Sequence, residues 1–177
     1  MIVFIDMDGP FNSMRNAMLK MRYDPVGAKA ASQLLSHPGV ITVLSASVRH
    51  TCRTPEEATE TLKRRYGLKG MTFHSDWKTG HTLNRDEGKH NGRSKEIAAW
   101  IAKNGRDQGE RYYAIDDEPI DVDGVHHIKA DYNGLPFESI MFMKHLMGEI
   151  KEHEYTDWLV FIENRKREEA KLILGIT

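Results

Sequence analysis

Short apolar runs alternate along the chain with longer segments in which apolar residues recur every three or four positions. Three clear runs, rich in β-branched and aromatic residues, span residues 2–5, 40–44 and 111–115. Such runs are typical of buried strands in parallel sheets. Residues 69–74 and 125–128 predict two further strands from weaker patterns.

Helix start signals lie between these runs. Asp24-Pro25 and Thr54-Pro55 each place proline after an N-cap residue, and they predict helices that reach about Ser36 and Tyr66. Helical spacing of apolar residues predicts three more helices, at residues 93–102, 137–145 and 155–174. Alternating strands and helices predict a single α/β domain with a mainly parallel sheet flanked by helices. We expect a core of residues 1–147 and a C-terminal helical extension of residues 148–177. The last helix is expected to pack on the sheet or on a second subunit, so a homodimer is one expected assembly.

Polar groups follow three of the predicted strands at their carboxyl ends. Asp6 and Asp8 follow the first strand, Ser45 and Ala46 the second, and the pair Asp116-Asp117 ends the strand at 111–115. Residues two apart in a strand face the same side, and open α/β sheets bind ligands at the carboxyl ends of their strands. Two close acids can bind a divalent cation or divide nucleophile and acid/base roles. The alternative for residues 6–10 is a simple turn, because Asp and Gly are common turn residues.

Composition limits the picture without choosing a partner. The 177 residues are 40% hydrophobic and 29% charged, which is typical of one soluble globular domain, and a net charge of −1 predicts no partner. The segment from Arg49 to Lys95 contains eleven basic and six acidic residues. This excess of positive charge could attract phosphate groups, and the alternative is ordinary solvated surface charge. The single Cys52 excludes an intrachain disulfide, and no apolar stretch is long enough to cross a membrane. The first strand begins at once, which leaves no room for a signal peptide, so a cytoplasmic location is the default expectation.

Two polar features remain open or neutral. The segment of residues 75–92 is rich in Gly, His, Asn and Asp, and it is either a lid over the site or an inert insertion. His126 and His127 are neighbours in a predicted strand and point to opposite faces, so we interpret them as structural residues rather than as ligands of a shared metal.

The ordered set Asp6-Met7-Asp8-Gly9, Leu44-Ser45, Lys95 and Ile115-Asp116-Asp117 resembles the four motifs of the haloacid dehalogenase (HAD) superfamily of phosphohydrolases. The resemblance spans about residues 2–135 and implies a Rossmann-like three-layer sandwich. Residues 93–100 and 130–135 look most like the compact HAD domains of nucleic-acid repair and phage proteins.

The resemblance also implies roles. Asp6 would attack phosphorus and form an aspartyl-phosphate, and Asp8 would protonate the leaving oxygen and later activate water. Asp6, the Asp8 carbonyl, Asp116 and Asp117 would hold Mg²⁺. Ser45 and one base would hold the phosphoryl oxygens. We favour Lys95 as that base, with Arg93 and Lys89 as alternatives. Further substrate contacts are expected from Ala46, Arg49 and Arg93.

Two departures from the family pattern bear on the substrate. Pro10 and Phe11 follow Asp8-Gly9 where the family usually has a small β-branched residue. No gap between motifs is long enough for a separate cap domain, so a large substrate can reach the site. We therefore expect a Mg²⁺-dependent phosphomonoester hydrolase for a nucleotide or a phosphorylated nucleic-acid end. The alternatives are a phosphatase for another small metabolite and a catalytically silent HAD-like domain that binds nucleic acid or a protein.

Overall fold

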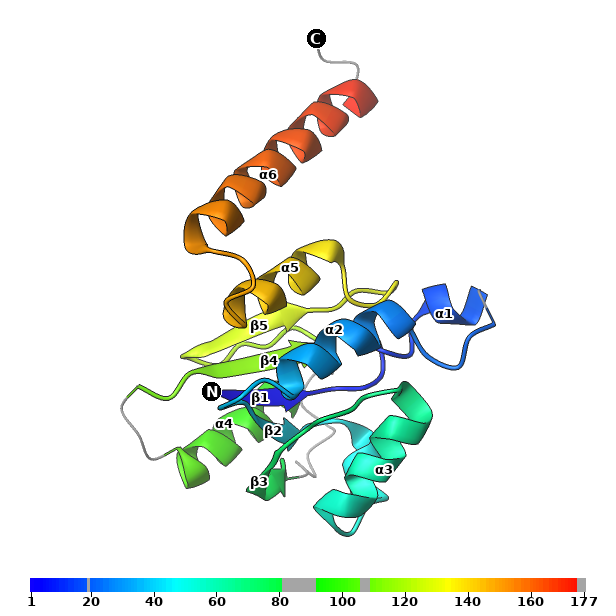
Figure 1. Cartoon of the computed structure of the whole chain (residues 1–177), viewed down its shortest axis with the longest axis vertical. Helices are drawn as coiled ribbons and strands as arrows, with labels where there is room; N and C mark the ends of the chain where they lie inside the picture. Colours follow the sequence, from blue (N-terminus) through cyan, green and yellow to red (C-terminus); the bar gives the residue numbers. More distant parts are fainter. Residues whose placement is uncertain (19, 81–91, 106–108, 175–177) are drawn as a thin grey trace.

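The computed structural model describes residues 1–18, 20–80, 92–105 and 109–174, and within them the chain forms a five-stranded, all-parallel sheet (Figure 1). The strand order is β3-β2-β1-β4-β5. The strands span Phe73–Lys78 (β3), Ile41–Leu44 (β2), Ile2–Ile5 (β1), Tyr112–Asp116 (β4) and Val125–Lys129 (β5). The predicted α/β class with a parallel sheet is therefore confirmed.

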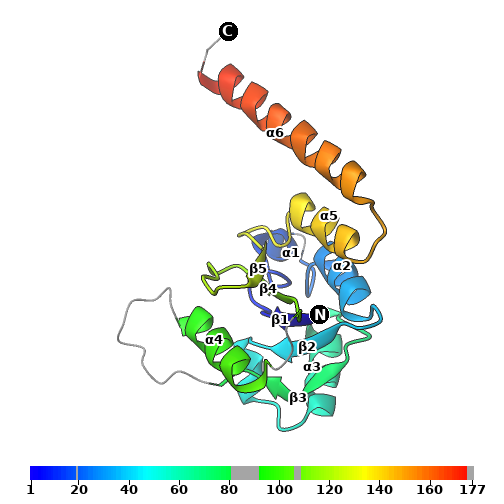
Figure 2. The same cartoon turned by 90° about the vertical axis from the view of Figure 1, so that its left-hand side faces the viewer.

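The central strand β1 explains the layering. Its four side chains are buried and alternate between two separate apolar clusters. Val3 and Ile5 face the cluster formed with α2 (Pro25–Leu35), α3 (Pro55–Tyr66) and α5 (Phe137–Leu146). Ile2 and Phe4 face α4 (Gly92–Asn104), where Phe4 meets the Trp100 ring edge-on at 5.3 Å. Figure 2 shows α4 on one side of the sheet and α2, α3 and α5 on the other, so the predicted three-layer sandwich is confirmed.

The predicted helix starts are present with their caps. The Asp24 carboxylate accepts hydrogen bonds from the backbone of Val26 and Gly27 at 3.0 and 3.3 Å, and the Thr54 hydroxyl accepts one from Glu57 at 3.3 Å. These bonds satisfy amide groups that have no partner within their own helix. Two short helices accompany them: α1 (Met14–Met18) after β1, and a 3₁₀ turn at Ser47–His50 after β2.

The weak strand predicted at 69–74 was placed too early. β3 runs from Phe73 to Lys78, where the buried Trp77 packs against Phe73 at 6.0 Å between ring centres. Residues before it follow α2 instead, since the Lys69 amide donates to the Ser32 hydroxyl at 3.1 Å. Part of the segment at 75–92, interpreted as either a lid or an inert insertion, is thus strand. Residues 81–91, which include Lys89, lie outside the described part.

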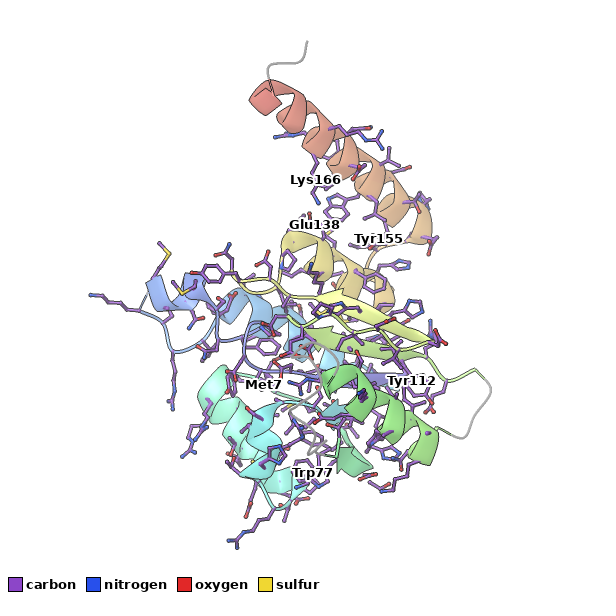
Figure 3. All side chains as sticks on the ribbon, turned by 180° about the vertical axis from the view of Figure 1, so that it is seen from behind. Met7, Trp77, Tyr112, Glu138, Tyr155 and Lys166 are labelled. Carbon is purple, nitrogen blue, oxygen red and sulfur yellow. The ribbon has the colours of Figure 1, made fainter. Side chains whose placement is uncertain are left out.

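The chain ends in the long helix α6 (Glu152–Leu174), which begins a turn earlier than predicted and extends away from the sheet (Figure 1). It meets α5 through stacked rings of His145 and Tyr155, 4.8 Å apart, and through an ion pair of 2.8 Å between Lys166 and Glu138 (Figure 3). Among the described helices, none combines the length and the apolar character needed to cross a bilayer.

Candidate active site

Strand register brings the polar strand ends together at one edge of the sheet. Ile5 of β1 is paired with Leu44 of β2 and with Ile115 of β4. The next residues continue this order, because the Asp6 amide donates to the Ile115 carbonyl at 2.9 Å and the Ser45 amide donates to the Ile5 carbonyl at 3.0 Å. Asp6, Ser45 and Asp116 therefore lie side by side, as the sequence predicted.

Three carboxylates form a compact acidic group at this edge. Asp6, Asp116 and Asp117 each offer an oxygen, and these atoms all lie within 4.8 Å of one another. Asp6 and Asp116 are buried, with 5% and 1% of their surface exposed, while Asp117 is exposed. The Asp116 Oδ2 atom is buried and accepts no hydrogen bond from the described residues. Clustered carboxylate oxygens with spare lone pairs fit a hard divalent cation such as Mg²⁺.

Arg93, in the first turn of α4, is the base that contacts the acidic group. Its Nη2 donates to Asp6 Oδ1 at 3.0 Å, and its Nε lies 3.2 Å from Asp116 Oδ2. The Arg93 side chain is only 14% exposed. Its Nη1 is buried and donates to no group among the described residues, so it can hold an anionic oxygen.

Lys95, which the sequence analysis favoured for this position, is exposed. Successive helical residues are about 100° apart around the axis, so Arg93 and Lys95 project in nearly opposite directions. Ile97 and Trp100 are buried four and seven residues after Arg93, on the same face of α4. That spacing was visible in the sequence and is the signal that singles out Arg93.

Burial controls the charge of the two inner acids. It raises the pKa of Asp6 to about 7, with a smaller increase from Asp116, while the Arg93 guanidinium acts in the opposite direction. Burial likewise raises the pKa of Asp116 to about 6, again opposed by Arg93. One guanidinium therefore does not fully compensate for the removal of two carboxylates from water. A divalent cation in the acidic group would favour both charged forms.

Asp8 lies on the loop beyond β1, is exposed, and is not part of the three-carboxylate group. Its Oδ1 accepts a hydrogen bond of 3.4 Å from the Asn12 side chain. The next residue, Gly9, has φ +83°, and a Cβ atom added to it would lie 2.4 Å from Asp117 Cγ. Phe11 is fully buried and its amide donates to the Met7 carbonyl at 3.2 Å. The unusual Pro10-Phe11 pair thus anchors this loop in the core and leaves Asp8 accessible.

Ser45 and Ala46 directly follow β2, and both are buried. The Ser45 hydroxyl has no hydrogen-bond partner among the described residues. Thr79, which follows β3, has a second buried hydroxyl of this kind, and its amide donates to the Leu44 carbonyl at 3.0 Å. Ser45 is therefore equipped to donate to an anionic oxygen at the strand ends. The sequence analysis did not identify Thr79.

Arg49, expected to contact substrate, is buried and bound by protein groups. Its guanidinium donates to Glu96 of α4 at 2.8 Å, to the Gly80 carbonyl at 3.3 Å and to the Ser45 carbonyl. Burial lowers its pKa, and Glu96 opposes that effect. Arg49 thus connects the loop after β2 to α4. Glu96 was missed because its partner lies 47 residues away in sequence.

The two histidines of β5 have separate contacts, as expected from neighbours in a strand. His126 stacks on Tyr113 with 5.3 Å between ring centres, whereas His127 Nε2 lies 3.0 Å from the Asp116 carbonyl oxygen. His127 therefore supports the backbone of β4 where it delivers Asp116.

Comparison with known families confirms the resemblance drawn from the motifs. The model of the HAD domain in Swiss Army Knife RNA repair proteins matches residues 2–132, a range that contains every strand and the residues of the acidic group. No curated protein and no solved structure gave a match. The chain belongs to the family of HAD domains found in Swiss Army Knife RNA repair proteins.

Proposed function

We propose that the protein is a Mg²⁺-dependent phosphomonoesterase that acts through an aspartyl-phosphate on the phosphorylated end of a nucleic acid. Family membership supports a HAD-type phosphatase in general. The observation that supports the detailed proposal is the position of Asp6, which is buried, contacts Arg93 at 3.0 Å and shares an acidic group with Asp116 and Asp117. A carboxylate in such a place cannot meet a phosphate dianion unless positive charge screens their repulsion.

In this proposal Asp6 Oδ attacks phosphorus, the bond to the leaving oxygen breaks, and Asp8 gives that oxygen its proton. Asp8 then takes a proton from water, which attacks phosphorus and releases phosphate from Asp6. Arg93 Nη1 and the Ser45 hydroxyl hold phosphoryl oxygens as negative charge shifts among them. We thus assign the role of the cationic residue that holds the phosphoryl oxygens to Arg93 rather than to Lys95. Asp6, Asp116 and Asp117 would hold Mg²⁺, which supplies positive charge beside the phosphoryl group.

Three features support a nucleic-acid end as substrate. The matching family takes its description from RNA repair proteins. Among the described residues between β1 and β2, the helices are α1 and α2 alone, so this part of the segment forms no separate folded cap. The exposed acid Asp8 lies at the surface, where the end of a large substrate can reach it.

The decisive experiment compares Asp6→Asn with the wild type. Phosphate release is measured with Mg²⁺ from p-nitrophenyl phosphate, mononucleotides, sugar phosphates and oligonucleotides carrying a 3′- or 5′-phosphate. We expect Asp6→Asn to lose turnover by at least about a thousandfold, because the nucleophile is removed. The matched control is Asp157→Asn, at an exposed position on α6, and it should keep full activity.

Each other result has a definite meaning. Hydrolysis of sugar phosphates alone would overturn the nucleic-acid substrate. Substantial turnover by Asp6→Asn would overturn the aspartyl-phosphate. A wild type that binds oligonucleotides but hydrolyses no phosphomonoester would be a silent binding domain.

A further inference from the structure

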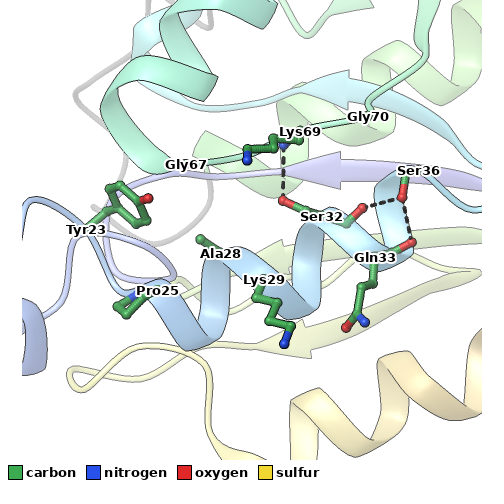
Figure 4. A pocket seen from close by; sticks show the side chains of 10 residues that line it. All are labelled: Tyr23, Pro25, Ala28, Lys29, Ser32, Gln33, Ser36, Gly67, Lys69 and Gly70. Carbon is green, nitrogen blue, oxygen red and sulfur yellow. Dashed lines mark hydrogen bonds between the residues drawn. The ribbon is translucent and has the colours of Figure 1, made fainter.

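A groove outside the acidic group runs along α2, with a volume of about 410 Å³ (Figure 4). One wall is α2, and the other is the connection from α3 to β3. The groove is lined by Tyr23, Pro25, Ala28, Lys29, Ser32, Gln33, Ser36, Gly67, Lys69 and Gly70. At about 1.5 Å per helical residue, the wall from Pro25 to Ser36 is roughly 16 Å long. The groove is therefore long enough to follow an extended ligand.

Close backbone approach builds the second wall. Gly67 and Gly70 have φ of +70° and +74°, which L side chains rarely adopt. A Cβ on Gly67 would lie 2.4 Å from the Tyr23 ring, and one on Gly70 would lie 2.5 Å from Ser36 Cβ. Between them the Lys69 amide donates to the Ser32 hydroxyl at 3.1 Å (Figure 4). The connection thus lies close to the residues that flank α2, Tyr23 and Ser36, and is hydrogen-bonded to α2 through Ser32.

The charge of the groove favours an anion. Its lining contains two lysines, Lys29 and Lys69, both exposed, and no acidic residue. Ser32 and Gln33 add a hydroxyl and an amide that can donate hydrogen bonds. Three exposed bases, Lys63, Arg64 and Arg65, lie in the last turn of α3 just before Gly67, outside the lining of the groove. The positive charge of the lining attracts phosphate groups and repels basic peptides.

The Tyr23 end of the groove adjoins the loop after β1, which carries Asp8. The amide of Asp24, next to Tyr23, donates to the Phe11 carbonyl at 2.9 Å, three residues from Asp8. On the opposite wall, Tyr66 precedes Gly67. Burial raises the pKa of Tyr66; the charge of Asp8 raises it further, Arg65 opposes this, and Asp6 adds a smaller increase, as expected for a residue near both acids. A ligand in the groove can therefore extend to the acidic group.

We propose that this groove binds the sugar-phosphate backbone of the substrate strand, behind the terminal phosphate held at Asp6. The inference rests on the proposed function and adds to it a second binding region, which a mononucleotide is too short to use. Lys29 and Lys69 neutralise internal phosphates. The strand passes over the contact between Tyr23 and Gly67 to reach the loop after β1, which carries Asp8.

Binding and turnover test the proposal separately. Fluorescence anisotropy is measured with a labelled single-stranded oligonucleotide that carries a terminal phosphate, using Asp6→Asn protein so that the phosphate stays on. Lys29→Glu/Lys69→Glu on this background should weaken binding at least about tenfold at low salt. It should reduce the slope of log K against log salt by about one for each lysine. Lys151→Glu, an exposed reversal outside the groove, is the matched control and should change binding less than twofold.

In active protein, the double reversal should raise KM for the oligonucleotide about tenfold and leave p-nitrophenyl phosphate hydrolysis unchanged. Equal oligonucleotide binding by the double variant and the Lys151→Glu control would overturn the groove proposal. So would equal loss on both substrates. Absence of any wild-type hydrolysis, with groove-dependent binding intact, would instead overturn the proposed function alone.

Discussion

Two buried arginine–carboxylate pairs each have one member on α4: Glu96, which binds Arg49, and Arg93, which binds Asp6. The two pairs differ in the hydrogen bonds that their other atoms make. Arg49 and Glu96 are 2.8 Å apart, with 4% and 8% of their side chains exposed, and the guanidinium also donates to two backbone carbonyls. Arg93 and Asp6 are 3.0 Å apart and similarly buried, but Arg93 Nη1 and Asp116 Oδ2 have no hydrogen-bond partner among the described residues. In the first pair, Arg49 Nε also lacks a partner among the described residues, but both terminal nitrogens of the guanidinium are bound by protein oxygens. The second keeps bonding capacity for a ligand, which is the mark of a site rather than of a support.

The largest expected effect on stability is at the first pair. Glu96→Ala leaves the buried Arg49 charge without its carboxylate and should lower the free energy of unfolding by about 3–5 kcal/mol, measured by urea denaturation. Lys103→Ala, which breaks the exposed pair with Asp76, is the control and should cost about 0–1 kcal/mol. Arg49→Met/Glu96→Leu should recover most of the loss, since it removes both charges. Equal urea midpoints for Glu96→Ala and Lys103→Ala would show that the Arg49–Glu96 pair does not stabilise the fold more than an exposed ion pair does.

The second pair should respond in activity. Arg93→Ala should lower kcat by about 10²–10³, roughly 2.7–4 kcal/mol of transition-state stabilisation, because Nη1 no longer meets the phosphoryl oxygens. In Mg²⁺ its loss of stability should be smaller than that of Glu96→Ala, since the carboxylates keep a cation. Arg93→Lys should restore part of kcat. A larger loss of kcat from Lys95→Ala than from Arg93→Ala would show that Lys95, not Arg93, holds the phosphoryl oxygens.

Substitution of Gly9 tests whether its contact with Asp117 matters for activity, apart from the strain of a positive φ. Gly9→Ala places a methyl group at a positive φ and against Asp117, so we expect about 1–3 kcal/mol of strain together with lost activity. Gly39→Ala is the matched control, because Gly39 has φ +81° and an added Cβ would meet nothing within 4 Å. It should cost similar stability and leave kcat unchanged. Unchanged kcat in both variants would show that the Gly9 contact has no role in catalysis.

The smallest effect concerns pH. Because the pKa values of Asp6 and Asp116 are raised to about 7 and about 6, the folded, metal-free protein holds protons that the unfolded chain has released. Their contribution to stability is therefore fully present below about pH 4 and is lost as the pH rises through 6 and 7. In the proposed site Mg²⁺ would bind the deprotonated acids, so its apparent affinity should rise by up to about tenfold per pH unit for each displaced proton.

This is measured as the Tm shift caused by Mg²⁺ between pH 5.5 and 8, which should grow with pH in the wild type. Asp116→Asn should flatten the dependence. A Mg²⁺ shift that is constant with pH in the wild type would contradict the coupling.

Local sequence patterns predicted most of the fold and the outline of the site. Apolar runs such as residues 2–5 mark buried strands, and in a parallel sheet their polar ends must meet at one edge, so Asp6, Ser45 and Asp116 were found without tertiary information. Capping residues placed α2 and α3 for the same local reason.

The errors lay where nonlocal packing decides. The preference for Lys95 over Arg93 is an exception, because the apolar positions Ile97 and Trp100, four and seven residues after Arg93, already indicated which face of α4 meets the sheet. The Arg49–Glu96 pair joins residues 47 positions apart, which no local pattern encodes. β3 was misplaced because residues 69–70 lie against α2, while Trp77 is what the sheet buries.

Gly9 has a mechanical consequence for the two exposed acids. The Asp117 side chain lies directly against the Gly9 backbone, one residue from Asp8, so the loop after β1 and the loop after β4 are in close contact. In the proposed mechanism, a cation that shifts Asp117 would therefore also shift Gly9 and the neighbouring Asp8, so that metal binding and alignment of the proton donor would be coupled.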